Sequence, residues 1–182
     1  MAIPILQRAR RQLTREVGLG EEAFTHLYQQ HLERVFNYVR YRLGSEEAED
    51  ITADIFARVW ARRRDYDPGK GTETTWLWAI ARNAVTDWLR RHRPLQVELS
   101  PDVAAAGDPL VEVDQEEEWQ RVRLALEHLP AVDQEIIALR FGAGHTNRMI
   151  ATLTGLSEAN VAQRLRRALR SMRAYLHGDD EL

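Results

Sequence analysis

Apolar and amphipathic residues in the first half of the chain recur at helical spacing. The stripe falls at i, i+3, i+4, i+7, i+11 and i+15, on Phe24, Leu27, Tyr28, His31, Val35 and Val39. This spacing is typical of an amphipathic helix with one buried face. Nowhere do apolar and polar residues alternate with period two for long enough to indicate a strand. The pattern therefore predicts an all-α fold.

Two more helices are predicted before residue 95. Gly44 is expected to end the first helix, and Ser45 is a candidate N-cap for the second. The apolar positions of the second helix are Ala48, Ile51, Ile55, Val59 and Trp60. The segment "DYDPGKGTETT", residues 65–75, contains one proline and two glycines and predicts a loop. The third helix lies in "WLWAIARNAVTDWLRRHRP", which ends at Pro94. Its inward stripe is expected to be Leu77, Ile80, Ala81, Ala84 and Trp88.

An acidic segment separates the two halves of the chain. Between Pro94 and Gln120 lie eight acidic residues and no lysine or arginine. Prolines, a glycine and small residues in "SPDVAAAGDPL" indicate a flexible linker over residues 95–115. We therefore predict two small helical domains, residues 22–94 and 116–182, joined by this acidic linker. Residues 1–21 form an N-terminal extension and a candidate accessory helix.

Composition narrows the function. The 182 residues include no cysteine, which excludes disulfides and thiolate metal sites. The six histidines form no metal-ligand pattern such as H-E-x-x-H, and no nucleophile motif is present. We therefore expect no metal, no cofactor and no enzymatic activity. No run approaches the ~18 apolar residues of a membrane span, and the first residues lack the apolar core of a signal peptide. A cytoplasmic protein without membrane insertion is expected.

Residues 146–176 predict a helix–turn–helix. Thr146 and Ser157 are candidate caps of its two helices, and Gly155 supplies the turn between them. The second helix has an apolar stripe on Val161, Leu165, Ala168, Met172 and Leu176. Its opposite face carries Ala159, Gln163, Arg166 and Arg170, with Arg167 beside them. Cations opposite an apolar stripe suit the phosphates and bases of a major groove, although arginines on an exposed helix face are often only solvated.

Four segments resemble, in the same order, the extracytoplasmic-function sigma factors of bacterial RNA polymerase. They are "LYQQHLERVFNYVRYRLG", "AEDITADIFARVWARR", "WLWAIARNAVTDWLRRHRP" and "LEHLPAVDQEIIALRFGAG", the last followed by the helix–turn–helix. The resemblance implies a subunit that directs core polymerase to specific promoters and helps to melt the minus-ten element. It implies core RNA polymerase and promoter DNA as partners, with an anti-sigma factor as a further candidate.

The resemblance also implies roles for individual residues. The second helix docks on polymerase in the family, which implicates Asp50, Ile51, Asp54, Phe56, Val59 and Trp60. Asp50 and Asp54 are the better candidates for an exposed contact, because the aliphatic members match core positions. The third helix is similar to the minus-ten reader, which leaves Arg82, Asn83, Asp87, Arg90, Arg91 and Arg93 for DNA. The loop before it matches the segment that holds a flipped base. The minus-thirty-five contacts are expected from Ser157, Asn160, Gln163, Arg164, Arg166, Arg167 and Arg170.

The helix–turn–helix departs from the family pattern at three positions. Met149 stands where a glutamate is usual, Thr154 where a leucine is usual, and Ala162 where the recognition helix usually has a lysine. Losing that lysine weakens the expectation of minus-thirty-five binding, although Asn160 and Gln163 suit adenine edges. A second hypothesis therefore stays open, namely a sigma-like interaction protein. Such a protein binds polymerase or an anti-sigma partner without strong sequence-specific DNA recognition.

Overall fold

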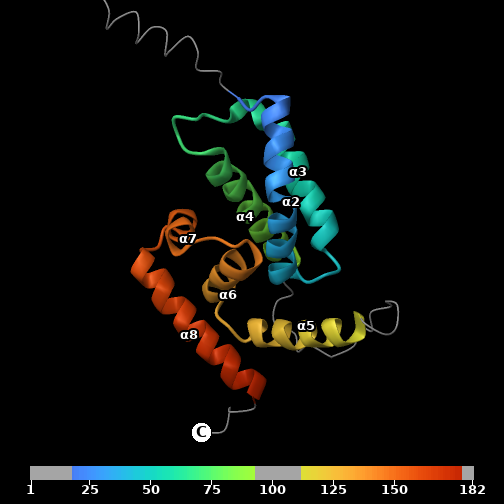
Figure 1. The fold of residues 1–182 in the computed structure, drawn as a ribbon, viewed down its shortest axis with the longest axis vertical. Helices are drawn as coiled ribbons and strands as arrows, with labels where there is room; N and C mark the ends of the chain where they lie inside the picture. The colour runs from blue at the N-terminus through green and yellow to red at the C-terminus, as the bar shows by residue number, and fades with distance from the viewer. Residues whose placement is uncertain (1–17, 93–111, 178–182) are drawn as a thin grey trace, which may run out of the picture.

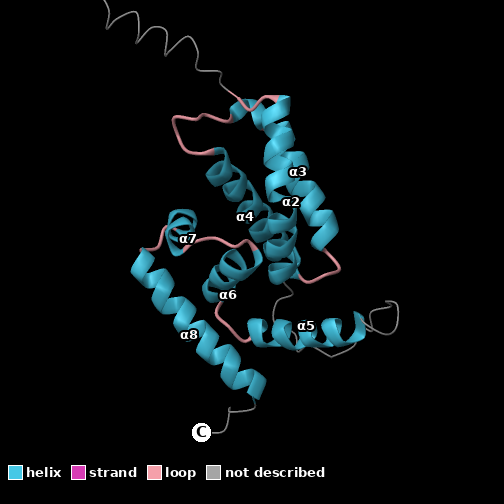
Figure 2. Cartoon of the chain, viewed as in Figure 1, coloured by secondary structure: helices cyan, strands magenta, loops and turns pink. Residues whose placement is uncertain are grey.

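The computed structural model describes residues 18–92 and 112–177, and every regular element in these residues is helical (Figure 1, Figure 2). The first half forms a bundle of α2 (Glu21–Leu43), α3 (Ala48–Ala61) and α4 (Glu73–His92), with the 3-10 turn η1 (Arg63–Asp65) after α3. The second half contains α5 (Glu112–Glu127), α6 (Ala131–Ile137), the π-helical turn η2 (Ala138–Gly142), α7 (Asn147–Thr154) and α8 (Glu158–His177). The predicted all-α fold in two helical domains is confirmed.

The N-terminal bundle follows the predicted periodicity with two differences. The buried face of α2 contains Leu27, His31, Val35, Tyr38, Val39 and Leu43, whereas Phe24 and Tyr28 of the predicted stripe are partly exposed. Gly44 ends the helix with a φ of 105°, which is strained for residues other than glycine. The expected cap at Ser45 is wrong, because a turn intervenes and α3 begins at Ala48.

The third helix buries side chains outside its predicted stripe. Besides Leu77, Ile80, Ala81 and Ala84, its buried side chains include Trp78 and Val85. Trp88, which was expected to face inward, is only half-buried, and its ring stacks on that of His92 with centroids 4.4 Å apart. The helix begins after Thr72, whose hydroxyl accepts a hydrogen bond from the backbone N–H of Thr75 at 3.2 Å.

In the second half, α7 and α8 form the predicted helix–turn–helix. The hydroxyl of Thr146 accepts from Met149 N at 3.2 Å, so the cap forms without the usual glutamate. The hydroxyl of Ser157 accepts from Asn160 N at 3.2 Å, and Gly155 makes the turn with a φ of 74°. Helix α5 begins at Glu112, inside the segment assigned to the linker. The rest of that segment and residues 1–17 lie outside the described residues.

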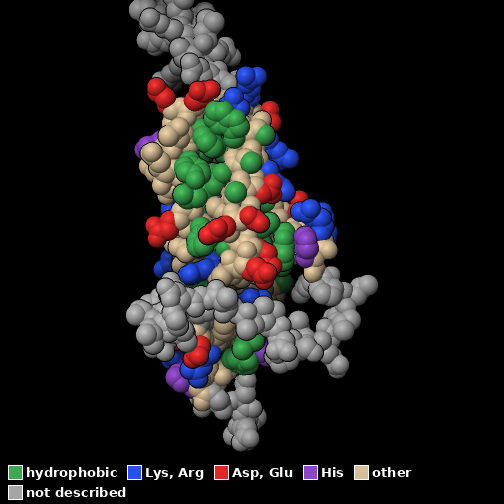
Figure 3. Space-filling model, turned by 90° about the vertical axis from the view of Figure 1, so that its right-hand side faces the viewer, with side chains coloured by type: hydrophobic (Ala, Val, Ile, Leu, Met, Phe, Trp, Pro, Cys, Tyr) green, Lys and Arg blue, Asp and Glu red, His purple; other side chains and the backbone are tan. Residues whose placement is uncertain are grey.

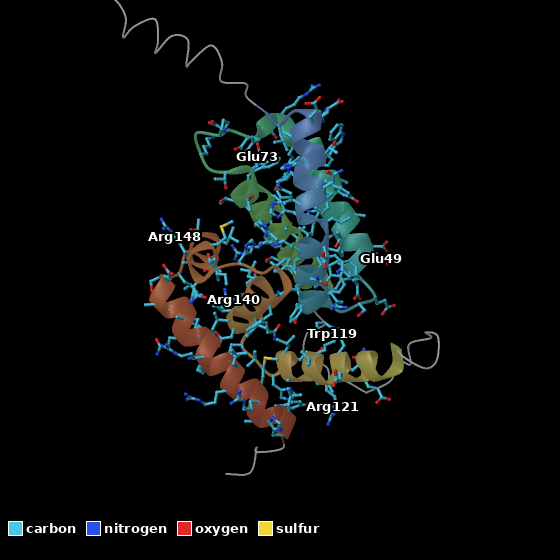
Figure 4. All side chains as sticks on the ribbon, viewed as in Figure 1. Glu49, Glu73, Trp119, Arg121, Arg140 and Arg148 are labelled. Atoms are coloured by element: carbon cyan, nitrogen blue, oxygen red, sulfur yellow. The ribbon has the colours of Figure 1, made fainter. Side chains whose placement is uncertain are left out.

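The two domains pack directly against each other. Turn η2 lies along α2, where a Cβ atom on Gly142 would come within 3.0 Å of the Tyr38 Cα and the Asn37 carbonyl oxygen. Trp119, on the side of α5 that faces α2 (Figure 4), places its ring 4.8 Å from that of Tyr41. One cluster of buried side chains therefore runs through both domains.

Candidate nucleic-acid and polymerase interfaces

The loop between η1 and α4 encloses an open hollow of about 630 Å³. The carboxylate of Asp67 accepts from Gly69 N at 2.9 Å, and the hydroxyl of Tyr66 donates to the Gly71 carbonyl at 3.1 Å. The Tyr66 ring lies 5.5 Å from that of Trp76. These bonds fix the loop around a hollow that offers an aromatic ring, hydroxyls and backbone groups. Such a lining suits a planar, polar group such as an unstacked base.

The last turns of α4 present a cationic surface. Asn83, Arg90 and Arg91 are exposed. Arg90 pairs with Asp87 at 3.0 Å, and Arg91 donates to the Asp87 carbonyl at 3.1 Å. An exposed ion pair of this kind contributes about 0–1 kcal/mol, so a phosphate can displace Asp87 at small cost. Arg93 lies outside the described residues.

Arg82 lies on another face of α4 and contacts the second domain. Its Nε is 2.8 Å from Glu135 Oε1, and a second nitrogen donates to the Leu153 carbonyl. The other oxygen of Glu135 is 3.0 Å from Arg42 Nε, and the Tyr38 hydroxyl donates to this carboxylate at 3.0 Å. Burial, and then the nearby Glu135 carboxylate, raise the pKa of Tyr38 well above its usual value, so this hydroxyl remains a donor. Two guanidinium groups and one hydroxyl therefore surround a single buried carboxylate at the domain contact.

Two buried histidines lie near this contact. The ring of His145 is 4.4 Å from that of Trp78, and its Nδ1 is 3.2 Å from Arg34 Nη2. The same arginine donates from Nε to the Ala143 carbonyl at 2.6 Å. Burial, with the charge of Arg34, lowers the pKa of His145 to about 4, and the same two causes lower that of His31. Both imidazoles are therefore neutral near pH 7.

Helix α8 exposes the predicted polar face. Among the residues predicted to bind DNA here, Ser157, Asn160, Gln163, Arg166, Arg167 and Arg170 are exposed. Arg167 and the partly buried Arg164 also reach Asp133 of α6, at 2.9 and 2.7 Å respectively. Burial alone would raise the pKa of Asp133, but hydrogen bonds from the two arginines outweigh it and hold this pKa below its usual value. These two arginines thus already have a partner within their own domain.

An apolar groove of about 380 Å³ lies between α2 and α3. It is lined by Tyr28, Leu32, Phe36, Thr52, Ala53 and Phe56, with Glu33 and Glu49 at its edge. Figure 4 shows Glu49 extending from α3 away from the bundle. Figure 3 shows hydrophobic side chains gathered on this face with acidic side chains beside them. Beyond the groove Trp60 is 37% exposed, and its ring lies 4.9 Å from that of Phe24. An exposed apolar surface with a polar rim marks a protein-binding site.

The residues predicted to bind polymerase divide by exposure. Asp50 is exposed, and Asp54 is half-buried in a pair with Arg58 at 2.7 Å. Ile51 is half-buried, and Phe56 reaches the groove although it is only 4% exposed. Val59 is 0% exposed, so its prediction as a direct contact is wrong. It shares the inner face of α3 with Ile55, one turn away.

Residues 18–92 and 112–177 contain no helix long and apolar enough to cross a membrane. The same residues contain no cluster of three or more His, Cys, Asp or Glu side chains placed to hold a metal ion.

Comparison with known proteins identifies the family. The family model of sigma-70 region 2 matches residues 27–94, and that of sigma-70 region 4 matches residues 119–172. The chain is 30% identical to the ECF RNA polymerase sigma factor RpoE of Cereibacter sphaeroides over 161 residues, which cover 86% of this chain and 87% of that protein. The chain belongs to the extracytoplasmic-function sigma factors. It is an RNA polymerase sigma factor, and the interaction-protein hypothesis is not favoured.

Two further comparisons extend the match along the chain. The sigma factor is 27% identical to the ECF RNA polymerase sigma factor SigK of Mycolicibacterium vanbaalenii, over 96% of this chain and 92% of that protein. Among solved structures it is similar to CnrH, which was determined in complex with the cytosolic domain of CnrY. That similarity has a TM-score of 0.67 and 25% identity, and covers 88% of this chain and 92% of the CnrH chain.

Sequence reasoning missed the acidic residues that engage the arginines of this sigma factor. Glu135 and Asp133 were not singled out, and neither was His145. One signal was present, because Glu135 directly precedes the apolar run of residues 136–139. A carboxylate in such a run is expected to be buried, and a buried carboxylate needs cationic or hydrogen-bonding partners.

Proposed function

We propose that this sigma factor binds core polymerase through the groove between α2 and α3, reads the minus-ten element with the residue 66–74 loop and α4, and reads the minus-thirty-five element with α8. The observation that carries the proposal is the division of the surface. An acid-rimmed apolar groove occupies one face, and exposed arginines occupy the end of α4 and the outer face of α8.

Melting of the minus-ten element is assigned to the first domain. The hollow beside Tyr66 is large enough to hold a base that has left the duplex. Arg90 and Arg91, roughly 24 Å further along α4, supply phosphate contacts at the other end of this helix. Stacking and backbone contacts of this kind are the usual basis of single-strand recognition.

Recognition by α8 is assigned a smaller share of the affinity. Gln163, Arg166 and Arg170 are exposed with no partner among the described residues. Ala162 contributes no charge, and Arg164 and Arg167 are partly engaged by Asp133. The α8 face therefore offers fewer free cations than its sequence suggests.

The packed arrangement must open for both readers to work at once. The two promoter elements are about 25 base pairs apart, which is about 85 Å of duplex at 3.4 Å per base pair. In the structure α7, the helix before α8, contacts α4 directly. Residues 93–111, fully extended, span at most about 65 Å, which together with the size of the two domains is enough to bridge the elements.

The proposal places the protein in the cytoplasm as a non-enzymatic partner of core polymerase. CnrH was solved in complex with the cytosolic domain of CnrY. We therefore include an anti-sigma factor among the proposed partners of this chain.

Run-off transcription with core polymerase and a promoter pool tests the proposal. The parent is expected to initiate at a restricted set of promoters. Replacing Arg90 and Arg91 by alanine should reduce open-complex formation more than replacing Arg166 and Arg170. Each lost phosphate contact should lower the slope of log affinity against log salt by about one unit. Variants that melt and transcribe like the parent would remove both arginine pairs from the DNA interface.

A further inference from the structure

The carboxylate of Glu135 occupies a site built by the other domain. Tyr38 and Arg42 come from α2 and Arg82 from α4, and all three contact the two oxygens at 2.8–3.1 Å. The Arg42 side chain is only 6% exposed, and that of Glu135 is 11% exposed. The site is therefore nearly closed to solvent while the domains are packed together.

Without Glu135 the same three groups would form an unbalanced cationic site. No other carboxylate in the part of the chain that the structure describes pairs with Arg42 or Arg82. Two guanidinium groups and a hydroxyl donor are suited to an anion with several oxygens, which means a carboxylate or a phosphate. Arg82 directly precedes the exposed Asn83 on α4, so the site adjoins the helix that we assign to the minus-ten element.

We propose that Tyr38, Arg42 and Arg82 form a binding site for a backbone phosphate of promoter DNA, and that Glu135 fills this site when the two domains are packed together. The proposal rests on the assignment of α4 as a DNA reader. Phosphate binding at this site and packing of the domains exclude each other, because one anion must leave before the other enters.

Competition of this kind lowers the DNA affinity of the free protein. The apparent affinity is reduced by the fraction of molecules in the open, binding-competent arrangement. If about one molecule in ten is open, complete opening raises the apparent affinity about tenfold. Core polymerase, by separating the domains, would expose the phosphate site.

Two variants open the domains by different routes. Glu135→Gln removes the competing charge. Gly142→Ala leaves every charge in place and adds a Cβ atom within 3.0 Å of the α2 backbone at Asn37 and Tyr38. Each has a matched control. Glu127→Gln removes an exposed carboxylate from α5, and Gly20→Ala adds a Cβ atom with nothing within 4 Å.

The experiment measures binding of the full chain to a fluorescent pool of random single-stranded 12-mers by anisotropy. Glu135→Gln and Gly142→Ala are both expected to bind about tenfold more tightly than the parent, while the controls bind like the parent. Adding Arg82→Ala to the Gly142→Ala variant should abolish the gain. Small-angle scattering of the same samples reports whether the domains have separated.

Four results would overturn the proposal. Domains that separate without a gain in affinity would show that the site takes no phosphate, and domains that stay packed in both variants would show that Glu135 does not hold them. A gain that survives Arg82→Ala would place the phosphate elsewhere. If Arg82→Ala instead weakens binding to core polymerase and leaves DNA affinity unchanged, the natural anion is a protein carboxylate. Run-off transcription by the parent separates these failures from failure of the proposed function, because the parent initiates whether or not Glu135 competes.

Discussion

Acidification should loosen the contact between the two domains through His145. This imidazole is 4% exposed, and the charges that act on it are those of Arg34 and His31, both from α2. Its other neighbours are Trp78 of α4, in ring contact, and Arg140, which donates to its carbonyl oxygen at 2.8 Å. Among the described residues, the site that would receive this proton contains cations and an aromatic ring but no carboxylate partner.

The sign and size of the effect follow from linkage. Burial, followed by the charge of Arg34 from the other domain, lowers the pKa of His145 from 6.5 to about 4. With the ordinary pKa of 6.5 in the open form, the packed arrangement has its full stability above pH 6.5 and loses it as the pH falls from 6.5 toward 4. Between pH 7.5 and 5.5 the loss from this one group is about 1.3 kcal/mol, or nearly tenfold in the equilibrium between packed and open forms.

Energy transfer between two dyes measures this equilibrium. The chain contains no cysteine, so Ala57→Cys on α3 and Ser171→Cys on α8 provide two exposed labelling positions. Transfer should fall as the pH is lowered from 7.5 to 5.5, and His145→Gln should remove most of that change. A transfer signal that is flat over this range in the parent, or a decrease of equal size in His145→Gln, would refute the reasoning.

Other predictions concern the polymerase groove and the second domain. Asp54→Arg should weaken binding to core polymerase in a titration while changing the free energy of unfolding by less than about 1 kcal/mol, with Glu22→Arg at an exposed position of α2 as the control. Trp60→Ala should also weaken this binding, since it removes the exposed ring that lies beside the groove between α2 and α3. Unchanged affinity would exclude the ring from the interface. Asp133→Asn should lower the free energy of unfolding by about 2 kcal/mol in urea titrations, because two arginines lose their buried anion. Because hydrogen bonds from Arg164 and Arg167 hold the pKa of Asp133 below its usual value of 3.8, that stabilisation is present above pH 3.8 and is lost as the pH falls further, and the difference between parent and variant should shrink accordingly.

Local patterns in the sequence were sufficient for the helices and the helix–turn–helix. The stripe of α2, the glycine at its end and the caps at Thr146 and Ser157 each depend on residues within a few positions of one another. The prediction of a cap at Ser45 was wrong because a serine followed by acidic residues is also compatible with a turn. Helix α3 begins at Ala48, which is buried in the core. The periodicity placed Val59 in the core, whereas the family resemblance placed it at the polymerase contact, and its burial decides for the core.

The packing of the two domains could not be predicted from such local patterns. It depends on Gly142, which lets η2 approach the α2 backbone, and on Arg34, which reaches the Ala143 carbonyl across 109 positions of the chain. Neither residue belongs to a periodic stripe that points to the other domain. The same limit applied to Arg82, because a helical projection of α4 shows which face it occupies but not what covers that face.

Helix α6 contacts both DNA-reading regions through two acidic residues that are two positions apart. At 3.6 residues per turn, Asp133 and Glu135 point about 200° away from each other. Asp133 faces α8 within its own domain, whereas Glu135 faces α2 and α4 of the other domain. Separation of the domains therefore breaks only the second set of contacts. We expect opening to free Arg42 and Arg82 for a new anion, while Arg164 and Arg167 remain bound to Asp133. The DNA-reading face of α8 therefore gains no free arginine, whereas α4 gains Arg82, which its sequence predicted to bind DNA.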